Sequence, residues 1–252
     1  MSNVSISTNK LTIGYRRVAG DSHSNEVVIQ SDLNFALQQG EMVCMLGPNG
    51  CGKSTLLRTL AGLQPALSGE FTHCDSKFIA LVLTERLSME NTTVHDVVAM
   101  GRYPYTSFLG GLTDKDEQII EQALEAVGFS ITDNRSPITV TPFNAHSDGE
   151  KQRILIAKAL AQQTPIILLD EPTAHLDLPH RILVLRLLRQ LAQEQGKTVL
   201  ISTHELDLAL ALSDRIMLMT PNKGIELDTA ENLKKADAFT SAFGMDIFNP
   251  LG

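Results

Sequence analysis

The loop Gly47-Pro-Asn-Gly-Cys-Gly-Lys-Ser54 decides how the rest of the sequence is interpreted. It fits the pattern G-x-x-x-x-G-K-[S/T] at every fixed position. Glycines let successive backbone N–H groups turn inward around phosphate oxygens, and Lys53 supplies a positive charge for the β- and γ-phosphates. We therefore predict a nucleoside triphosphate site, against the alternative of a glycine-rich turn that binds nothing. The predicted contacts are Gly47, Pro48, Asn49, Gly50, Cys51, Gly52, Lys53, Ser54 and Thr55.

The segments on either side of the loop predict an α/β fold. The apolar run Met42–Leu46 precedes it, and the helical stretch Ser54–Ala61, closed by Gly62, follows it. This is the order strand, loop, helix in which a helix N-terminus receives phosphate. Further strands are predicted at Val4–Ile13, Val27–Leu37, Phe78–Leu83, Ile166–Leu169, Thr198–Ser202 and Ile216–Met219, and helices at Glu150–Gln162 and Pro179–Gln195.

The segment from Thr84 to His146 has a different character, typical of a helical insertion. Thr93-Val-His-Asp96 predicts a capping box that opens a helix, which we expect Gly101 to close. Apolar residues recur at helical spacing in Asp114–Gly128. The whole chain is thus expected to be one domain, with an α/β core over 1–83 and 147–252 and a helical subdomain over 84–146.

Two acidic residues, Asp170 and Glu171, directly follow the predicted apolar strand Ile166–Leu169. Such residues lie at the carboxyl edge of a parallel sheet, where ligands bind. Asp170 there is a candidate for holding Mg²⁺, and Glu171 a candidate for accepting a proton from an attacking water. A strand that ends in two carboxylates is more often the start of a solvated loop, but the phosphate-loop lysine upstream favours the functional interpretation.

Ser147-Asp-Gly-Glu150 predicts another capping box, at the start of the helix that continues to Gln162. One interpretation is a well-capped helix and nothing more. The other is that this helix start receives a phosphate through Ser147 and the Gly149 amide. The two interpretations are compatible.

Composition excludes several classes of protein. Among 252 residues, 43% are hydrophobic and 20% charged, a balance that argues against disorder. The net charge of −8 disfavours non-specific nucleic-acid binding. Cys44, Cys51 and Cys74 fit neither a disulfide framework nor a metal site, which indicates a reducing cytosol. The segment Met1–Lys10 lacks the apolar core of a signal peptide, and no run is long and apolar enough for a membrane helix.

Taken together, the motifs resemble those of the nucleotide-binding subunits of ATP-binding cassette (ABC) transporters over nearly the whole chain. Residues 47–54 correspond to the family's phosphate loop and 166–171 to its metal and base strand. His146–Glu150, followed by Lys151-Gln-Arg153, resembles the signature loop. Ala174-His-Leu-Asp177 resembles the dimer loop, His204 stands at the switch histidine, and Tyr15 matches the aromatic residue that stacks on adenine.

Simpler roles remain open for the less specific members of this set. A tyrosine after a strand is usually a surface packing residue, and a histidine such as His204 can cap a strand end. Asp177 would cap the helix near Pro179 whatever else it does. Cys51 is predicted to be a small residue inside the loop, sensitive to alkylation because of the nearby phosphates.

Two positions depart from the family pattern. The signature loop is usually Leu-Ser-Gly-Gly-Gln or Leu-Ser-Gly-Gly-Glu, whereas here Asp148 adds a negative charge. The family commonly has a glutamine that touches Mg²⁺ and the permease, and Glu85 stands at the matching position. A carboxylate still ligates Mg²⁺. We therefore expect Ser54, Glu85 and Asp170 at the metal.

The resemblance implies an ATP-hydrolysing subunit of an importer. Residues 92–105 resemble the subfamily that energises uptake of ferric siderophores, haem and cobalamin. The implied fold is a P-loop NTPase core with a parallel sheet, an antiparallel β layer and a helical subdomain. Two copies are expected to enclose ATP and Mg²⁺ head to tail on the cytoplasmic face of the inner membrane, with a permease as direct partner and a substrate-binding protein as indirect one.

Two other classes remain as alternatives. One is a soluble cassette ATPase, such as an iron–sulfur assembly or translation-associated factor. The other is a nucleotide-binding module without turnover. The intact Glu171 and His204 argue against the last class. The residues expected to be catalytic are Glu171, His204 and Lys53, and the further expected nucleotide contacts are Tyr15, Ser147, Gly149, Glu150 and Asp177.

Overall fold

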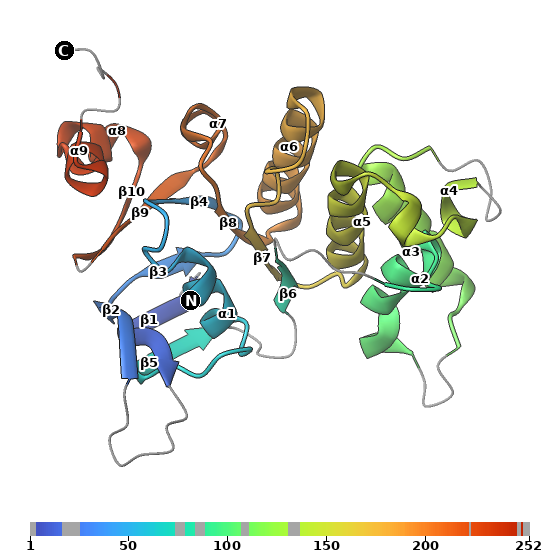
Figure 1. Cartoon of the computed structure of the whole chain (residues 1–252), viewed down its shortest axis with the longest axis horizontal. Coiled ribbons are helices and arrows are strands. Elements are labelled where there is room, and N and C mark those ends of the chain that lie inside the picture. Colours follow the sequence, from blue (N-terminus) through green and yellow to red (C-terminus); the bar gives the residue numbers. More distant parts are fainter. Residues whose placement is uncertain are drawn as a thin grey trace.

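The computed structural model describes residues 4–16, 26–73, 79–83, 89–106, 111–130, 137–221, 223–245 and 248. Within these ranges a central sheet has the strand order β10-β9-β4-β8-β7-β6 (Figure 1). Its strands are β4 (Met42–Leu46), β6 (Ile79–Val82), β7 (Ile166–Asp170), β8 (Thr198–Ser202), β9 (Arg215–Thr220) and β10 (Gly224–Asp228). All neighbours pair in parallel except β10, which is antiparallel to β9.

The central strands are apolar throughout because both faces of the sheet are covered. Every residue of β4, β7 and β8 is buried. Val43 and Met45 face one hydrophobic cluster, while Met42, Cys44 and Leu46 face another. Continuous apolar runs are typical of parallel strands packed on two sides. The parallel core expected from the sequence is therefore confirmed.

A second, antiparallel layer is built around the long strand β1 (Val4–Arg16). It pairs with β2 (Glu26–Leu33), β3 (Ala36–Gln38) and β5 (Ser68–His73). The prediction of one strand over Val27–Leu37 was wrong, because β2 ends at Leu33 and a separate strand, β3, begins at Ala36. Asp32 has a φ of 53°, and the break lets β3 pair with the beginning of β1 while β2 pairs with its end.

The phosphate-loop helix α1 (Lys53–Leu60) packs between these two layers. Leu56, Leu57 and Leu60 share a cluster with Ile6 and Leu11 of β1. The other face of the central sheet is covered by α6 (Leu178–Gln195), α7 (Leu206–Leu212), α8 (Ala230–Lys235) and α9 (Ala238–Phe243) together with α5 (Asp148–Ala161).

A group of helices lies at the end of the molecule away from the antiparallel layer (Figure 1). It contains α2 (Val94–Ala99), the 3-10 helix η1 (Met100–Tyr105), α3 (Asp114–Ala126) and α4 (Pro137–Val140), with a further 3-10 turn, η2 (Phe143–Ala145). The predicted capping box of α2 is present, with the side chain of Thr93 accepting from the amide of Asp96. Helix α5 stands between this group and β6 and contacts both.

The sequence predicted that Gly101 ends α2, but this prediction was wrong. The chain continues as η1 through this residue. A Cβ atom at Gly101 would lie 2.4 Å from the carbonyl oxygen of Lys158 and 3.1 Å from Ala161 Cβ. The glycine is therefore needed because η1 and α5 approach closely.

Arg102, the next residue, fixes η1 to its neighbours. Its Nε donates to Asp116 Oδ1 at 2.8 Å and its Nη1 to the carbonyl of Ala161 at 2.8 Å, and both charged side chains are buried. Hydrogen bonds from Thr113 and from this guanidinium lower the pKa of Asp116 to about 2.

No helix among the described residues is long and apolar enough to cross a membrane.

Candidate functional site

The predicted phosphate loop leaves the end of β4 and enters α1. Gly52 occupies the N-cap of α1 with a φ of 108° and a ψ of 14°, and no side chain caps the helix. Lys53 Nζ donates to the carbonyl oxygens of Gly47 at 2.8 Å and Pro48 at 3.3 Å. The first amides of α1 thus have no side-chain acceptor, as a helix start that binds an anion requires.

At Gly47 and Gly52 of the phosphate loop there is no room for a side chain. A Cβ at Gly47 would lie 2.3 Å from the carbonyl oxygen of Met219, at the end of β9. A Cβ at Gly52 would lie 2.6 Å from Ile29 Cγ2 on β2. The loop is therefore held between the central sheet and the antiparallel layer.

Cys51 is the small buried residue that the sequence predicted, with 2% of its surface exposed. Its expected sensitivity to alkylation is not supported. Burial raises the pKa of the Cys51 thiol, and this outweighs the lowering effect of Lys53. Because the thiolate is the reactive form, the environment disfavours alkylation.

Tyr15 lies near the end of β1, close to the loop. Its hydroxyl is hydrogen-bonded to Thr55 Oγ1 at 2.9 Å, and 44% of its surface is exposed. The contact brings two predicted nucleotide contacts together. Stacking of the ring on adenine stays a prediction.

The carboxyl ends of β7 and β8 hold the predicted metal and base residues. Asp170 is paired in register with Ser202, whose hydroxyl donates to Asp170 Oδ1 at 2.6 Å. The amide of Glu171 donates to the same hydroxyl at 2.9 Å. One serine thus fixes the orientation of both acidic residues.

Glu171 and His204 form a side-chain pair. His204 Nε2 lies 2.7 Å from Glu171 Oε1, and both side chains are partly exposed. Glu171 has a φ of 47°, which is uncommon for a residue other than glycine and is found at functional sites. A carboxylate oriented by a histidine and open to solvent is suited to accept a proton from water.

The predicted capping box at Ser147 is present at the start of α5. Ser147 Oγ accepts from the amide of Glu150 at 3.3 Å, and the Ser147 amide donates to Glu150 Oε2 at 3.0 Å. These hydrogen bonds lower the pKa of Glu150, with burial opposing the shift. A Cβ at Gly149 would lie 2.9 Å from the carbonyl oxygen of His175, so the start of α5 adjoins the segment 174–177.

Asp177 is the N-cap of α6, as expected. Its Oδ1 accepts from the amide of His180 at 3.2 Å and lies 2.5 Å from His180 Nδ1. The side-chain hydrogen bond from His180 is the largest cause of its lowered pKa. Any role of Asp177 at a nucleotide stays a prediction.

Most of the predicted residues lie at the carboxyl ends of the adjacent strands β4, β8 and β7, and the others lie at a different helix start. The phosphate loop, Tyr15 and Thr55 lie together, and Asp170, Glu171 and His204 lie together. Ser147, Gly149 and Glu150 belong to another helix start, which is joined to the segment before α6. Glu85 lies outside the described residues.

The donor set fits Mg²⁺. Ser54 and Asp170 offer hard oxygen ligands, and the described residues contain no cluster of three or more His, Cys, Asp or Glu side chains that would hold a metal alone. Mg²⁺ at phosphates usually takes one or two protein ligands and completes its shell with phosphate and water oxygens.

Two residues of this region were missed by the sequence analysis. Ser202 was noted only as part of a strand end, although its position one residue past an apolar run is a signal. Gln30 was not noticed; it is the first polar residue after the apolar run Val27–Ile29 and is followed by further polar residues, so no signal in the sequence indicated its role. Its Nε2 donates to the carbonyl oxygens of Cys51 at 3.0 Å and Thr220 at 2.9 Å.

Comparison with known proteins decides the family. The sequence profile described as "ABC transporter" matches residues 30–174, more than half of the chain. The chain belongs to the ABC transporter ATP-binding family. Membership confirms the predicted P-loop ATPase fold and activity.

Several named relatives are ATP-binding proteins of import or transport systems. The chain is 37% identical to the iron(3+)-hydroxamate import ATP-binding protein FhuC of Bacillus subtilis, covering 96% of this chain and 88% of the relative. It is 32% identical to the ferric enterobactin transport ATP-binding protein FepC of Escherichia coli, covering 94% and 86%.

Solved structures agree. An inward-facing structure of a metal-chelate type ABC transporter matches with a TM-score of 0.80 and 31% identity, covering 96% of this chain and 90% of that one. A dimeric ATP-binding cassette bound to ADP and Pi matches with a TM-score of 0.75 and 23% identity, covering 89% and 98%, and supports the fold.

Proposed function

We propose that this chain is the ATP-hydrolysing subunit of an importer for an iron chelate (siderophore), haem or cobalamin. The observation that carries the proposal is the joint presence of an open phosphate loop and the Glu171–His204 pair in a chain whose relatives are named as importer subunits. A soluble iron–sulfur assembly ATPase is not favoured, because the named relatives belong to uptake systems.

The roles of the site residues follow from their chemistry. Lys53 and the amides at the start of α1 bind the β- and γ-phosphates, and the ring of Tyr15 stacks on the adenine. Ser54 and Asp170, with Glu85, hold Mg²⁺, which neutralises charge on the phosphates when bound. Glu171 accepts a proton from the attacking water, and His204 orients this carboxylate and donates toward the γ-phosphate.

A second copy of the chain completes the site in this proposal. The start of α5, with Ser147 and Gly149, belongs to a different group from the phosphate loop within one chain. We propose that it meets the nucleotide held by the partner's loop, so that two ATP molecules lie between two head-to-tail copies. Asp177, beside α5, lies at the same interface.

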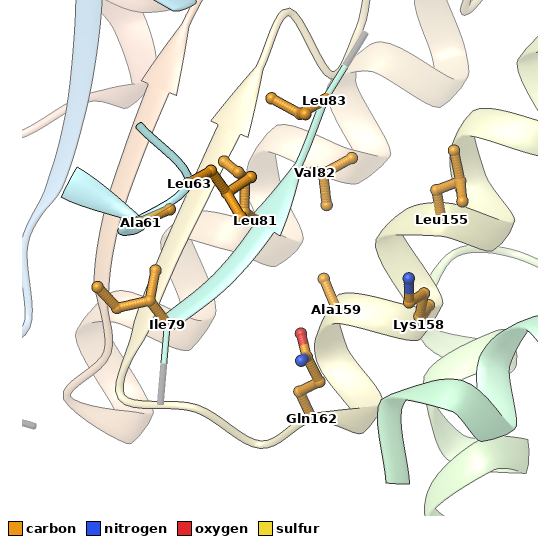
Figure 2. Close-up of a pocket in the computed structure, with 10 residues that line it drawn as sticks. All are labelled: Ala61, Leu63, Ile79, Leu81, Val82, Leu83, Leu155, Lys158, Ala159 and Gln162. Carbon is orange, nitrogen blue, oxygen red and sulfur yellow. The ribbon is translucent and has the colours of Figure 1, made fainter. Parts of the chain in front are cut away.

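We propose that the permease docks at a cavity between the edge of the central sheet and α5. The cavity has a volume of about 350 Å³ and lies between β6, at the edge of the central sheet, and α5 (Figure 2). Leu81 and Leu83 lie on its sheet side, with Lys158 and Gln162 on its helix side (Figure 2). All of its lining residues fall in the proposed α/β core (1–83 and 147–252), and α5, which forms its helix side, also contacts α2 and α3 of the proposed helical subdomain (84–146).

Docking there would couple ATP turnover to transport. This docking would also hold the chain at the cytoplasmic face of the membrane as a peripheral subunit, and the substrate-binding protein would contact the permease rather than this chain.

Leu63, which lines the cavity and is 66% exposed, provides a test of this docking site. Leu63→Glu should abolish co-purification with a co-expressed candidate permease while leaving ATP affinity intact. Leu183→Glu, on α6 and 37% exposed, is the matched control.

Turnover is tested separately by Glu171→Gln. The variant should bind ATP, lose hydrolysis and accumulate as an ATP-bound dimer in light scattering. Near-normal hydrolysis would exclude Glu171 as the base.

Glu85 is tested by two substitutions. Glu85→Gln should keep the ATPase rate within about tenfold of the wild-type rate, a change of roughly 1.4 kcal/mol in the activation barrier. Glu85→Ala should lower permease-stimulated ATPase more than basal ATPase.

A further inference from the structure

Gln30 is the least expected residue around the phosphate loop. It lies on β2 opposite Ile13 of β1, and only 2% of its surface is exposed. Its Nε2 donates to the carbonyl of Cys51, inside the loop, and to the carbonyl of Thr220, at the end of β9. One side chain therefore joins the antiparallel layer, the phosphate loop and the central sheet.

Packing alone does not account for a glutamine at this position. Its Oε1 atom is buried and has no hydrogen-bond partner among the described residues. A buried acceptor without a partner is destabilising, and a methionine would fill a similar space without it. The two donated hydrogen bonds are what the glutamine adds over an apolar residue.

These bonds act on the part of the loop that shapes the anion site. Cys51 directly precedes Gly52 and Lys53, and the Gln30 side chain packs beside Gly52, 3.7 Å from the position of a Cβ there. Because the N–H and C=O of one trans peptide point in opposite directions, holding the Cys51 carbonyl toward β2 turns the Gly52 N–H away from β2, toward the inner side of the loop. Thr220 provides the second fixed point, because its carbonyl also accepts from the amide of Lys223.

We propose that Gln30 is a positioning residue for ATP binding, which keeps the phosphate loop preorganised through the Cys51 carbonyl. It touches neither the nucleotide nor Glu171. Its loss should therefore weaken ATP binding and leave the rate of the bound complex almost unchanged. The inference rests on the proposed role of residues 47–54 as the phosphate site.

The test compares Gln30→Met with the wild-type chain. Methionine keeps the length of the side chain and removes both donors. We expect the Kd for Mg-ATP, measured with a fluorescent ATP analogue, to rise about tenfold, with the KM of ATPase rising in parallel and kcat within about twofold. Gln30→Asn, which keeps the amide on a shorter stem, should give an intermediate Kd and serves if the methionine variant fails to fold.

Three further variants separate the possible causes. Gln190→Met, an exposed glutamine on α6, controls for the substitution, and Leu188→Ala, a buried core residue, controls for lost stability. Wild-type affinity in folded Gln30→Met, or an equal loss in Leu188→Ala, would overturn the proposal. Lys53→Ala tests the site itself: if it binds ATP normally, the proposed phosphate site is wrong, whereas loss in Lys53→Ala with no loss in Gln30→Met rejects only the role of Gln30.

Discussion

Helices α1 and α5 both begin at loops that the sequence marked as phosphate sites, but their first turns differ. The α1 start has Gly52 as N-cap, no side-chain cap and no acidic residue in its first turn. The α5 start has the Ser147–Glu150 capping box and two carboxylates, Asp148 and Glu150. The α1 start is open to an anion and carries a lysine, whereas at the α5 start the capping box occupies the Ser147 and Glu150 amides and two carboxylates add negative charge.

The difference indicates unequal roles for the two helix starts. We expect a single chain to bind ATP at α1 by itself, because the first amides of α1 have no side-chain acceptor and Lys53 supplies a positive charge. The α5 start is suited to add contacts only after the nucleotide's charge has been largely neutralised elsewhere. This fits a site that is completed on dimer formation.

The largest expected effect is at α1. Lys53→Ala removes the cation of the open helix start and should weaken ATP binding about 100-fold or more, equivalent to roughly 3 kcal/mol. Titration with a fluorescent ATP analogue measures it, with Lys115→Ala on α3 as the control for a lost surface lysine. Near-normal binding by Lys53→Ala would remove the distinction between the two helices.

The shared site is tested by mixing two inactive variants. Ser147→Arg blocks the α5 start and Lys53→Ala the α1 start, so a mixed dimer retains one site with both starts intact. Permease-stimulated ATPase should return on mixing. If activity stays absent while each variant forms dimers with the wild-type chain, the α5 start does not act on the partner's nucleotide.

A smaller effect is expected from the extra charge at α5. Asp148→Asn removes a carboxylate near the proposed phosphate and should tighten ATP-driven dimerisation by about fivefold, or roughly 1 kcal/mol. The measurement is the dimer fraction against ATP concentration in the Glu171→Gln background. Asp114→Asn, at the first turn of α3, is the matched control, and equal shifts in both variants would exclude a local effect.

The smallest effect concerns pH. Because hydrogen bonds from Ser147 lower the pKa of Glu150, the capping box contributes stability above the pKa of the unfolded state, and this contribution is lost as the pH falls through the folded pKa. Glu150→Gln should therefore be less stable than the wild-type chain at pH 7, with the gap narrowing below about pH 4.3. Urea unfolding at several pH values measures it; a gap independent of pH would mean that the carboxylate charge has no part in the cap.

Local patterns predicted much of the fold. The runs at β4, β7 and β8, the caps of α2, α5 and α6, and the context of the phosphate loop were all readable from short stretches. Strands β5 and β10 were missed. Ser68–His73 contains a single large apolar residue, Phe71, and Gly224–Asp228 alternates over only five residues; both strands are fixed by pairing with β1 and β9. The η1 glycine was misassigned because its cause, the approach of α5, is not local.

The sequence by itself determined the chemistry of this protein: a phosphate loop with its lysine, a strand ending in Asp170 and Glu171, and a capped helix start at Ser147. These depend on residue types at short spacings, which a linear chain preserves. Only the tertiary structure decided which residues meet. The Glu171–His204 pair, the Ser202 bridge to Asp170 and the Gln30 bonds to Cys51 and Thr220 join residues 21 to 190 positions apart in the chain, because the pairing of the strands brings their ends and the following loops together.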